Sequence, residues 1–246
     1  MNYYGTKEYK KEIELLDRQV FCKCYTSEPS DVTELEDNYV LKVYSYKEIT
    51  EEPGYAAVRI KGSVCRLYQK DVLIFEWKCT EEEPILHYII HHSDGKQYFL
   101  FSLDLYGYGV LDLFSGDCLR YIPQKSKSSD LNKFEETFIW VKPHYDAISD
   151  LLAVEGCFWA APYSVIVLDF SEPMKIKSSD EWLDIMEICP DKIEGLPVGD
   201  IDFEKWDTDD LIVKAAIWGD NNISTFCAIK KTELKDKCEK GRKKGK

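Results

Sequence analysis

Short apolar runs, broken at regular intervals by turn-forming residues, dominate the chain from about residue 39 onward. The runs are rich in Val, Ile, Tyr, Phe and Trp, and Gly, Pro, Asp and Ser separate them, which is typical of β-strands joined by tight turns. This pattern predicts an all-β fold. The predicted strands are Tyr39–Tyr46, Tyr55–Ile60, Val64–Gln69, Val72–Trp77, Ile85–His91, Tyr98–Tyr106, Gly109–Phe114, Cys118–Ile122, Phe138–Val141, Leu151–Trp159, Ser164–Phe170, Leu211–Trp218 and Ile223–Ile229.

A few segments depart from the β pattern. Residues 6–20 place Ile13, Leu16 and Val20 at helical spacing with charges between them, which predicts one amphipathic N-terminal helix. The segment Glu181–Ile188 fits either a short helix or a strand. We expect an N-terminal helix and linker over residues 1–38, a single repeated all-β domain over 39–229 and a tail over 230–246. The predicted linkers are Glu28–Glu36, Gln124–Lys133 and Pro190–Thr208.

Three segments of the β region resemble one another. The run that begins at Tyr98 aligns with the run that begins at Asp150, and both align with the run that begins at Asp210 and ends on Trp218 and Gly219. The first two copies continue alike, through Val110–Ser115 and Val167–Ser171. A regular spacing of similar segments is the signature of a fold built from repeated units, so each unit is predicted to be a small antiparallel sheet.

The first copy, residues 99–121, resembles a β-propeller blade of the WD-repeat type. An apolar strand turns at a polar-Gly corner, returns through an apolar-Asp-Leu strand, and ends in the turn Ser115-Gly116-Asp117-Cys118-Leu119. The Gly-His opening and the Trp-Asp close of that family do not occur. The resemblance implies a propeller-like array of about four antiparallel units. The alternative with similar strand spacing is an irregular β-sandwich or meander.

Charge is distributed unevenly along the chain. The 246 residues carry 32 basic and 45 acidic side chains, a net charge of −13. The last seventeen residues hold nine basic and three acidic groups, so residues 1–229 carry 23 basic and 42 acidic groups, a net charge of −19. Because nucleic-acid binding needs clustered Lys and Arg, we expect no nucleic-acid partner. The basic tail is predicted to be a solvated, frayed end.

Cysteine usage and the N-terminus indicate a reduced, cytoplasmic setting. The nine cysteines are scattered and contain no C-x-x-C pair, and none of the four histidines lies at zinc-knuckle spacing from a cysteine. We therefore expect packing cysteines, with no metal and no cofactor. The first twenty residues lack the apolar region of a signal peptide, and no apolar run approaches the length of a membrane span.

Five side chains could serve acid–base chemistry if they faced one central pocket. They are Asp104, Asp112, His144, Glu155 and Asp169. Paired carboxylates at suitable separation act in hydrolases, but an Asp that follows an apolar strand commonly accepts backbone hydrogen bonds in a turn. His92 and His144 occupy equivalent positions in two copies, either as converging metal ligands or as residues at strand ends. The acidic stretch from Asp200 to Asp210 lacks the EF-hand glycine and glutamate, so we expect a solvated acidic turn.

Aromatic residues supply the candidate binding surface. Trp159 and Tyr163 flank Pro162 in a loop, where Trp159 is either an exposed recognition residue or packed between sheets. Tyr106 and Tyr108 lie in a tight Gly-rich turn that lacks the features of a phosphate loop. We expect a binding module whose acidic, aromatic surface recognises a protein partner, and the charge favours a basic one, such as a toxin or nuclease that the module neutralises. The alternative is a hydrolase or lyase that uses the five side chains.

Overall fold

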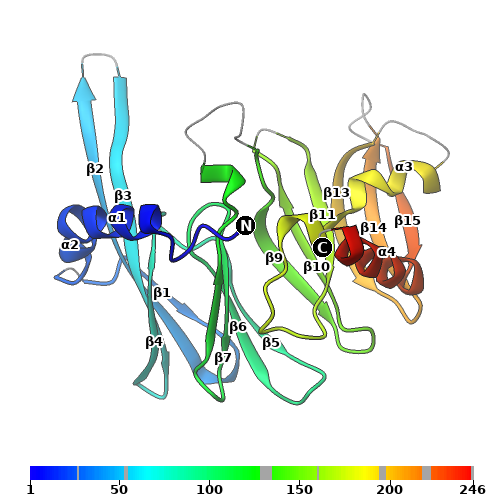
Figure 1. The fold of residues 1–246 in the computed structure, drawn as a ribbon, viewed down its shortest axis with the longest axis horizontal. Helices are drawn as coiled ribbons and strands as arrows, with labels where there is room; N and C mark the ends of the chain where they lie inside the picture. The colour runs from blue at the N-terminus through cyan, green and yellow to red at the C-terminus, as the bar shows by residue number, and fades with distance from the viewer. Residues whose placement is uncertain are drawn as a thin grey trace. The chain divides into compact units, whose positions relative to one another are not determined.

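The computed structural model describes residues 1–26, 28–52, 55–127, 135–159, 161–193, 198–217 and 223–244. Within them the chain forms four antiparallel sheets of three or four strands each, with one helix at the N-terminus (Figure 1). The predicted all-β fold with an N-terminal helix is therefore confirmed.

The chain falls into two compact units. The first comprises Met1–Ile90 and Gln97–Gln124, and the second comprises His91–Lys96 and Lys125–Lys246. Each unit contains two sheets. The region expected as one repeated domain over residues 39–229 is thus shared between two units, and the N-terminal helix belongs to the first of them.

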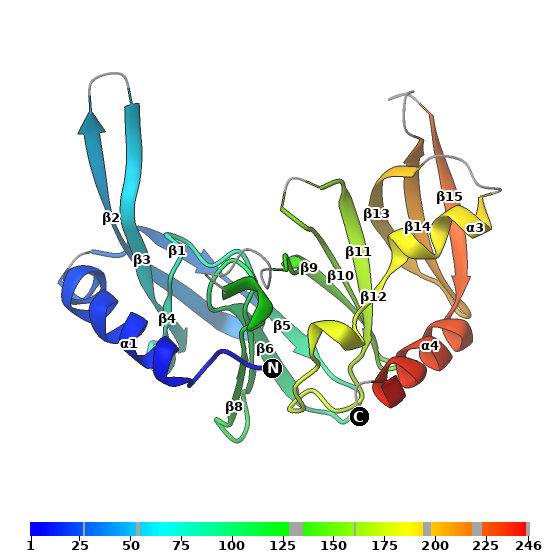
Figure 2. The ribbon, with the colours of Figure 1, turned by 45° about the horizontal axis from the view of Figure 1, so that its top comes forward.

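The first sheet of unit 1 has the order β1-β2-β3-β4. Its strands are β1 (Asp31–Glu34), β2 (Tyr39–Glu52), β3 (Tyr55–Gln69) and β4 (Val72–Cys79). β2 and β3 pair along their whole length, whereas β1 and β4 pair only with the half of this hairpin nearest Tyr39 and Gln69. The other half of the hairpin therefore extends beyond the two outer strands (Figure 2). The strand β1 corrects a predicted linker, and the runs predicted as two strands over residues 55–69 form one.

The second sheet of unit 1 carries the segment that resembles a propeller blade. It contains β5 (His87–His91), β6 (Gln97–Ser102), β7 (Tyr108–Asp112) and β8 (Cys118–Tyr121), each adjacent to the next in sequence. Phe99 and Phe101 of β6 pack on Trp77 of β4, with ring centroids 5.6 and 4.8 Å from that indole. These aromatic contacts join the two sheets into one core.

The N-terminal helix begins where the sequence predicts it. Thr6 caps α1 (Lys7–Leu16) by accepting a hydrogen bond from the Tyr9 backbone N–H. The helix continues through a π-helical segment, Asp17–Phe21, into α2 (Cys22–Cys24). Val20 and Phe21 are fully buried and pack with Val64 of β3, which fixes the helix on unit 1.

Unit 2 contains the remaining two sheets. One has β9 (Ile139–Asp146), β10 (Leu151–Cys157), β11 (Tyr163–Asp169) and the short β12 (Leu183–Asp184), in the order β12-β11-β10-β9. The other has β13 (Val198–Trp206), β14 (Asp210–Ile217) and β15 (Ser224–Lys230) in sequence order. The segment that fitted a helix or a strand contains both β12 and a 3-10 turn, Ile185–Glu187.

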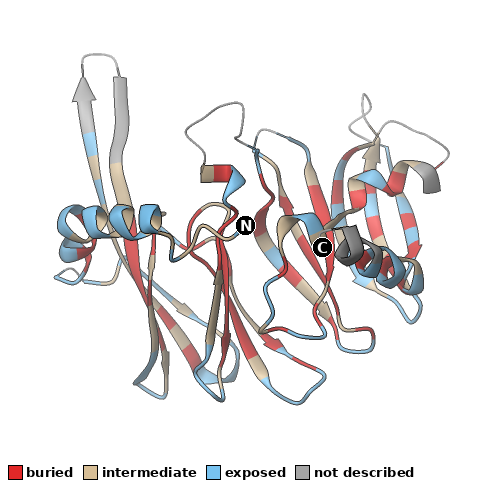
Figure 3. Cartoon of the chain, viewed as in Figure 1, coloured by how far each residue is buried: buried red, intermediate tan, exposed pale blue. Residues whose placement is uncertain are grey.

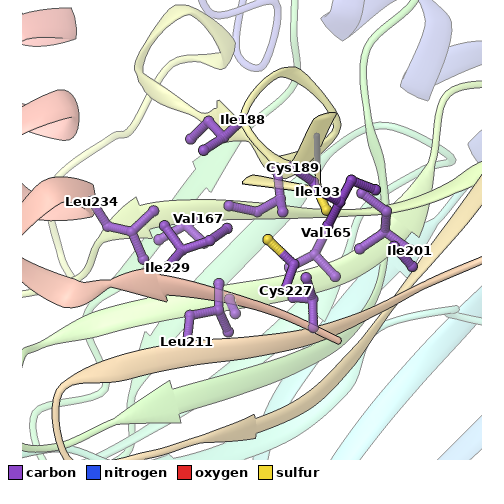
Figure 4. Packing of buried hydrophobic residues seen from close by; sticks show 14 of the residues in the cluster. Val165, Val167, Ile188, Cys189, Ile193, Ile201, Leu211, Cys227, Ile229 and Leu234 are labelled. Carbon is purple, nitrogen blue, oxygen red and sulfur yellow. The ribbon is translucent and has the colours of Figure 1, made fainter. Parts of the chain in front are cut away.

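One face of the β13–β15 sheet packs on β10, β11 and two helices. The core side chains point toward one another in Figure 4, where Val165 and Val167 of β11 meet Leu211 and Ile229 of the last sheet. The helix α3 (Cys189–Lys192) closes one side of this core, and α4 (Lys231–Lys244) follows β15 directly.

The basic tail is a helix for most of its length, not the frayed end that its charge predicted. Leu234 and Cys238 lie four residues apart, so they share one face of α4, and both are buried. Burial of this narrow apolar stripe anchors a segment whose other positions are mostly charged. The last two residues of the tail lie outside the described residues.

The three similar segments occupy corresponding strands. They form β6, β10 and β14, and each is the second strand of its sheet, counted along the chain. The end of the third copy, at Trp218 and Gly219, lies outside the described residues. The resemblance to propeller blades itself stays a prediction.

Candidate functional site

Three of the five predicted acid–base residues organise turns. Asp104 and Asp112 are buried, and Asp169 ends β11. Their carboxylates accept backbone N–H groups two or three residues further along the chain, which is the structural role that an Asp after an apolar strand commonly has. The donors are Tyr106 and Gly107 for Asp104, Phe114 and Ser115 for Asp112, and Ser171 for Asp169.

His144 and Glu155 are brought together in unit 2, on the adjacent strands β9 and β10. The His144 Nε2 atom lies 3.4 Å from Glu155 Oε2, and both side chains are mostly buried. Burial lowers the pKa of His144, although the neighbouring Glu155 works in the opposite direction. The imidazole stacks on the Phe203 ring at 3.8 Å, and Glu155 Oε1 accepts the Phe203 backbone N–H at 3.0 Å. The pair therefore fastens β13 to the preceding sheet.

His92, the other candidate metal ligand, has a separate setting in unit 2. Its ring stacks on Tyr145, and its Nε2 atom lies 3.1 Å from the Phe170 carbonyl oxygen. Because a carbonyl oxygen only accepts, Nε2 carries the proton and is not presented to a metal. No group of three or more His, Cys, Asp or Glu side chains suited to a metal ion occurs within the described part of the chain.

The four predicted aromatic binding residues differ in exposure. Tyr108 is only 3% exposed and packs on Tyr121, so little of its side chain is available to a partner, and its role in binding stays a prediction. Tyr106 is half-buried in the turn held by Asp104. Trp159 is 61% exposed in the turn after β10, which agrees with a recognition residue and not with packing between sheets. Tyr163 is half-buried and leads directly to an acidic pocket.

A surface pocket of about 410 Å³ lies in unit 2 where β11 meets the β13–β15 sheet. The Tyr163 backbone N–H donates to Asp200 Oδ1 at 2.7 Å, which holds the start of β11 against β13. The lining residues combine carboxylates, one cation and apolar groups, and include Tyr163, Asp200, Asp202, Lys214, Ile223 and Ser224.

The carboxylates of this pocket come from a strand that the sequence analysis assigned to a linker and an acidic turn. Along β13, Asp200 and Asp202 are exposed while Ile201 between them is fully buried. This alternation is the burial pattern of a strand with one solvated face, and Figure 3 shows it as alternating colours along the strands of this sheet. The alternating pattern Asp-Ile-Asp-Phe was the signal that could have revealed the strand.

The charge on Asp202 is held in an unfavourable setting. Partial burial, the charge of Glu155 and the charge of Asp200 raise the pKa of Asp202, and Lys214 offsets them only in part. Asp202 and Lys214 lie directly opposite each other on β13 and β14. A carboxylate kept beside two others does not serve the stability of the fold, and perturbed groups of this kind concentrate at functional sites.

The apolar side of the same surface is contributed by β15. Phe226 lies opposite Lys214 in the β14–β15 pairing, so Asp202, Lys214 and Phe226 form one row across the sheet. Phe226 is 62% exposed, and Ile223 just before the strand is 54% exposed. Two large apolar side chains thus lie in solvent beside the acidic pocket, where a partner would gain from covering them.

A second pocket, about 380 Å³, lies at the start of α4 and is lined by Lys230, Lys231 and Lys235 among others. Lys231 is committed to an internal partner, because its Nζ atom lies 2.8 Å from Asp146 Oδ2 and both side chains are more than nine-tenths buried. Lys230 likewise pairs with Asp210 at 3.0 Å. These lysines therefore serve the attachment of α4.

Comparison with known proteins gives no assignment. Neither the protein-family models nor the curated proteins compared with this chain match it. No helix among the described residues has both the length and the apolar composition needed to cross a membrane.

Proposed function

We propose that this protein is a binding module that recognises a basic protein partner through the acidic pocket of unit 2. The observation that supports the proposal is the grouping of Asp200 and Asp202 on one pocket, where partial burial and repulsion from the charges of Glu155 and Asp200 raise the pKa of Asp202. A cationic side chain from a partner would relieve this repulsion when it binds. The complex would therefore gain stability that the free protein lacks.

The pocket has the chemistry that a lysine or arginine side chain requires. Asp200 and Asp202 offer carboxylate oxygens to an ammonium or guanidinium group, and charge-assisted hydrogen bonds of this kind are stronger than neutral ones. Tyr163 and Ile223 line the same pocket, so they can cover the aliphatic stem of such a side chain.

The charge of the chain favours the same class of partner. A net charge of −19 over residues 1–229 speeds the diffusional encounter with a cationic surface. In our proposal the partner is a basic protein, for example a toxin or nuclease that this module neutralises. The alternative of a hydrolase or lyase is not favoured, because Asp104, Asp112 and Asp169 hold turns.

The test is salt-dependent capture of a basic partner by matched variants. The immobilised protein should retain a basic protein from a lysate of its source cells at low salt and release it at high salt. Asp202→Asn should abolish retention, whereas Glu136→Gln, which removes the same charge at an exposed position outside the pocket, should preserve it. Equal retention by both variants would overturn the proposal.

A further inference from the structure

The β13–β15 sheet has a solvated face opposite its core, and this outer face carries two different columns of side chains. We propose that the outer face is the docking surface for a basic amphipathic α-helix of the partner protein. This inference rests on the proposed function, because it takes the acidic pocket as the place where cations bind. It adds the shape of the partner segment and a second, apolar contact.

The outer face follows from strand alternation. Ile201, Val213 and Cys227 point into the core, so their neighbours Asp202, Lys214 and Phe226 point away from it. On β15 the exposed positions Ser224, Phe226 and Ala228 share this side. β13 thus contributes the carboxylates of Asp200 and Asp202, and β15 contributes a column in which the large apolar side chain of Phe226 lies between Ser224 and Ala228.

The separation of the two columns matches the width of a helix. Adjacent strands lie roughly 4.8 Å apart, so β13 and β15 are about 10 Å apart. An α-helix with its side chains is about 10–12 Å across. A helix laid along the sheet would therefore place one flank over the carboxylates and the opposite flank over Phe226 and Ile223.

The spacing along the strand also matches a helix. Asp200 and Asp202 are two residues apart on β13, which corresponds to roughly 6.7 Å of an extended strand. Residues four apart in an α-helix are separated by about 6 Å along its axis. Lys or Arg at positions i and i+4 of the partner helix would thus meet both carboxylates.

The chain's own basic helix is engaged elsewhere. α4 buries Leu234 and Cys238 in the core on the opposite side of this sheet, so its apolar stripe is already used. Its exposed positions mix Lys235 and Lys237 with Asp236 and Glu239, whereas the outer face requires separate basic and apolar stripes. The docking surface therefore fits a different protein better than a second copy of this chain.

Lys214 provides a further prediction from the same geometry. It stands between the two columns, opposite both Asp202 and Phe226, and is exposed. A basic helix over the sheet would bring its cations close to this ammonium group. Removing the Lys214 charge should therefore strengthen binding, although it removes a partner of Asp202.

The experiment uses the full chain and a fluorescein-labelled synthetic 18-residue peptide with a basic stripe and a leucine stripe. A control peptide has the same composition in scrambled order, which keeps the charge but removes the separate stripes. Fluorescence anisotropy at low salt measures the affinity for each. We expect the amphipathic peptide to bind at least about tenfold more tightly, which corresponds to about 1.4 kcal/mol.

Three variants, each checked for an unchanged circular dichroism spectrum, separate the contributions. Asp202→Asn and Phe226→Ser should each lower the affinity for the amphipathic peptide by about tenfold. Lys214→Gln should raise this affinity a few-fold. If both peptides bind with equal affinity, and only Asp202→Asn weakens that affinity, the helix inference is overturned and cation binding in the acidic pocket is supported. No loss in Asp202→Asn would overturn both. Self-association of the protein that Phe226→Ser abolishes would assign the face to a second copy and overturn the inference.

Discussion

The buried ion pair between Lys231 and Asp146 gives a quantitative prediction about how α4 is held. The two charged atoms lie 2.8 Å apart, and only 7% and 8% of the two side chains is exposed. Ser149 also donates its backbone N–H and its hydroxyl to the same carboxylate oxygen. Lys231→Met would leave this carboxylate buried without its countercharge.

The expected loss follows from the burial. Removing one partner of a buried ion pair typically costs about 3–5 kcal/mol, whereas replacing both partners by apolar groups is often neutral or stabilising. For a protein of this size about 4 kcal/mol corresponds to a fall in Tm on the order of 10 °C. Asp146→Leu combined with Lys231→Met should therefore recover most of the stability that the single variant loses.

Urea unfolding followed by tryptophan fluorescence measures the difference. Trp206 reports on the site, because the Lys231 ammonium lies 5.5 Å from the centroid of its ring. Lys175→Met is the control, since Lys175 and Glu172 form an exposed pair at 2.9 Å and such pairs are worth about 0–1 kcal/mol. A loss below about 1 kcal/mol for Lys231→Met, or a double variant as unstable as the single one, would show that the buried pair does not hold α4 in this way.

The same ion pair predicts how the stability of the fold changes at acid pH. Burial by itself would raise the pKa of Asp146, but the hydrogen bonds from Lys231 and Ser149 and the charge of Lys231 outweigh it, so that this pKa lies below 3.8. Its contribution is therefore present above pH 3.8, the unfolded value, and is lost as the pH falls through the lower folded value. Between pH 5 and pH 2 the wild type should lose more stability than Asp146→Asn, and parallel curves would contradict this.

Three further predictions concern the fold and the pocket. Leu234→Ala should cost about 2–5 kcal/mol in urea unfolding, because Leu234 is fully buried where α4 meets the core; an unchanged midpoint would mean that α4 does not need this contact. Gly156→Ala should be destabilising by at least about 1–3 kcal/mol in the same assay, since an added Cβ would lie 1.8 Å from the Ile139 carbonyl oxygen, and Ser224→Ala at an exposed position serves as its control. Asp202→Asn should raise the thermal midpoint at pH 7 but leave it unchanged well below pH 4, because a raised folded pKa means that ionisation of Asp202 opposes folding as the pH rises; a lower midpoint at pH 7 would contradict the cost assigned to this charge.

The strands rich in β-branched and aromatic residues could be predicted because local composition determines them. The strand β13 was missed because its acidic residues suggested a solvated loop. Exposure nevertheless alternates along it, since Asp200 and Asp202 are exposed while Ile201 is buried and Phe203 is partly buried. The helix α4 was missed for the related reason that only Leu234 and Cys238 carry its packing. In both cases a narrow apolar stripe outweighs a high density of charge.

The pocket itself could not be predicted from local sequence. Tyr163 and Asp200 are 37 residues apart, and their hydrogen bond forms only once β11 and β13 have come together. Of the side chains that the sequence suggested, Tyr163 lines this pocket, whereas Asp104 and Asp112 lie in turns. Carboxylates after apolar strands, such as Asp104 and Asp112, are recognisable in sequence because turns use them.

In our proposal Asp202 and its neighbours bind a cationic side chain of a partner. The most direct measurement is the pH and salt dependence of binding to the basic amphipathic peptide, compared between wild type, Asp202→Asn and the matched Glu136→Gln variant. We predict that the wild type and Glu136→Gln bind with the same affinity, which weakens with salt and as the pH falls far enough to protonate Asp202, and that Asp202→Asn binds about tenfold more weakly at neutral pH. Equal affinities for all three proteins would contradict binding of the cation at Asp202.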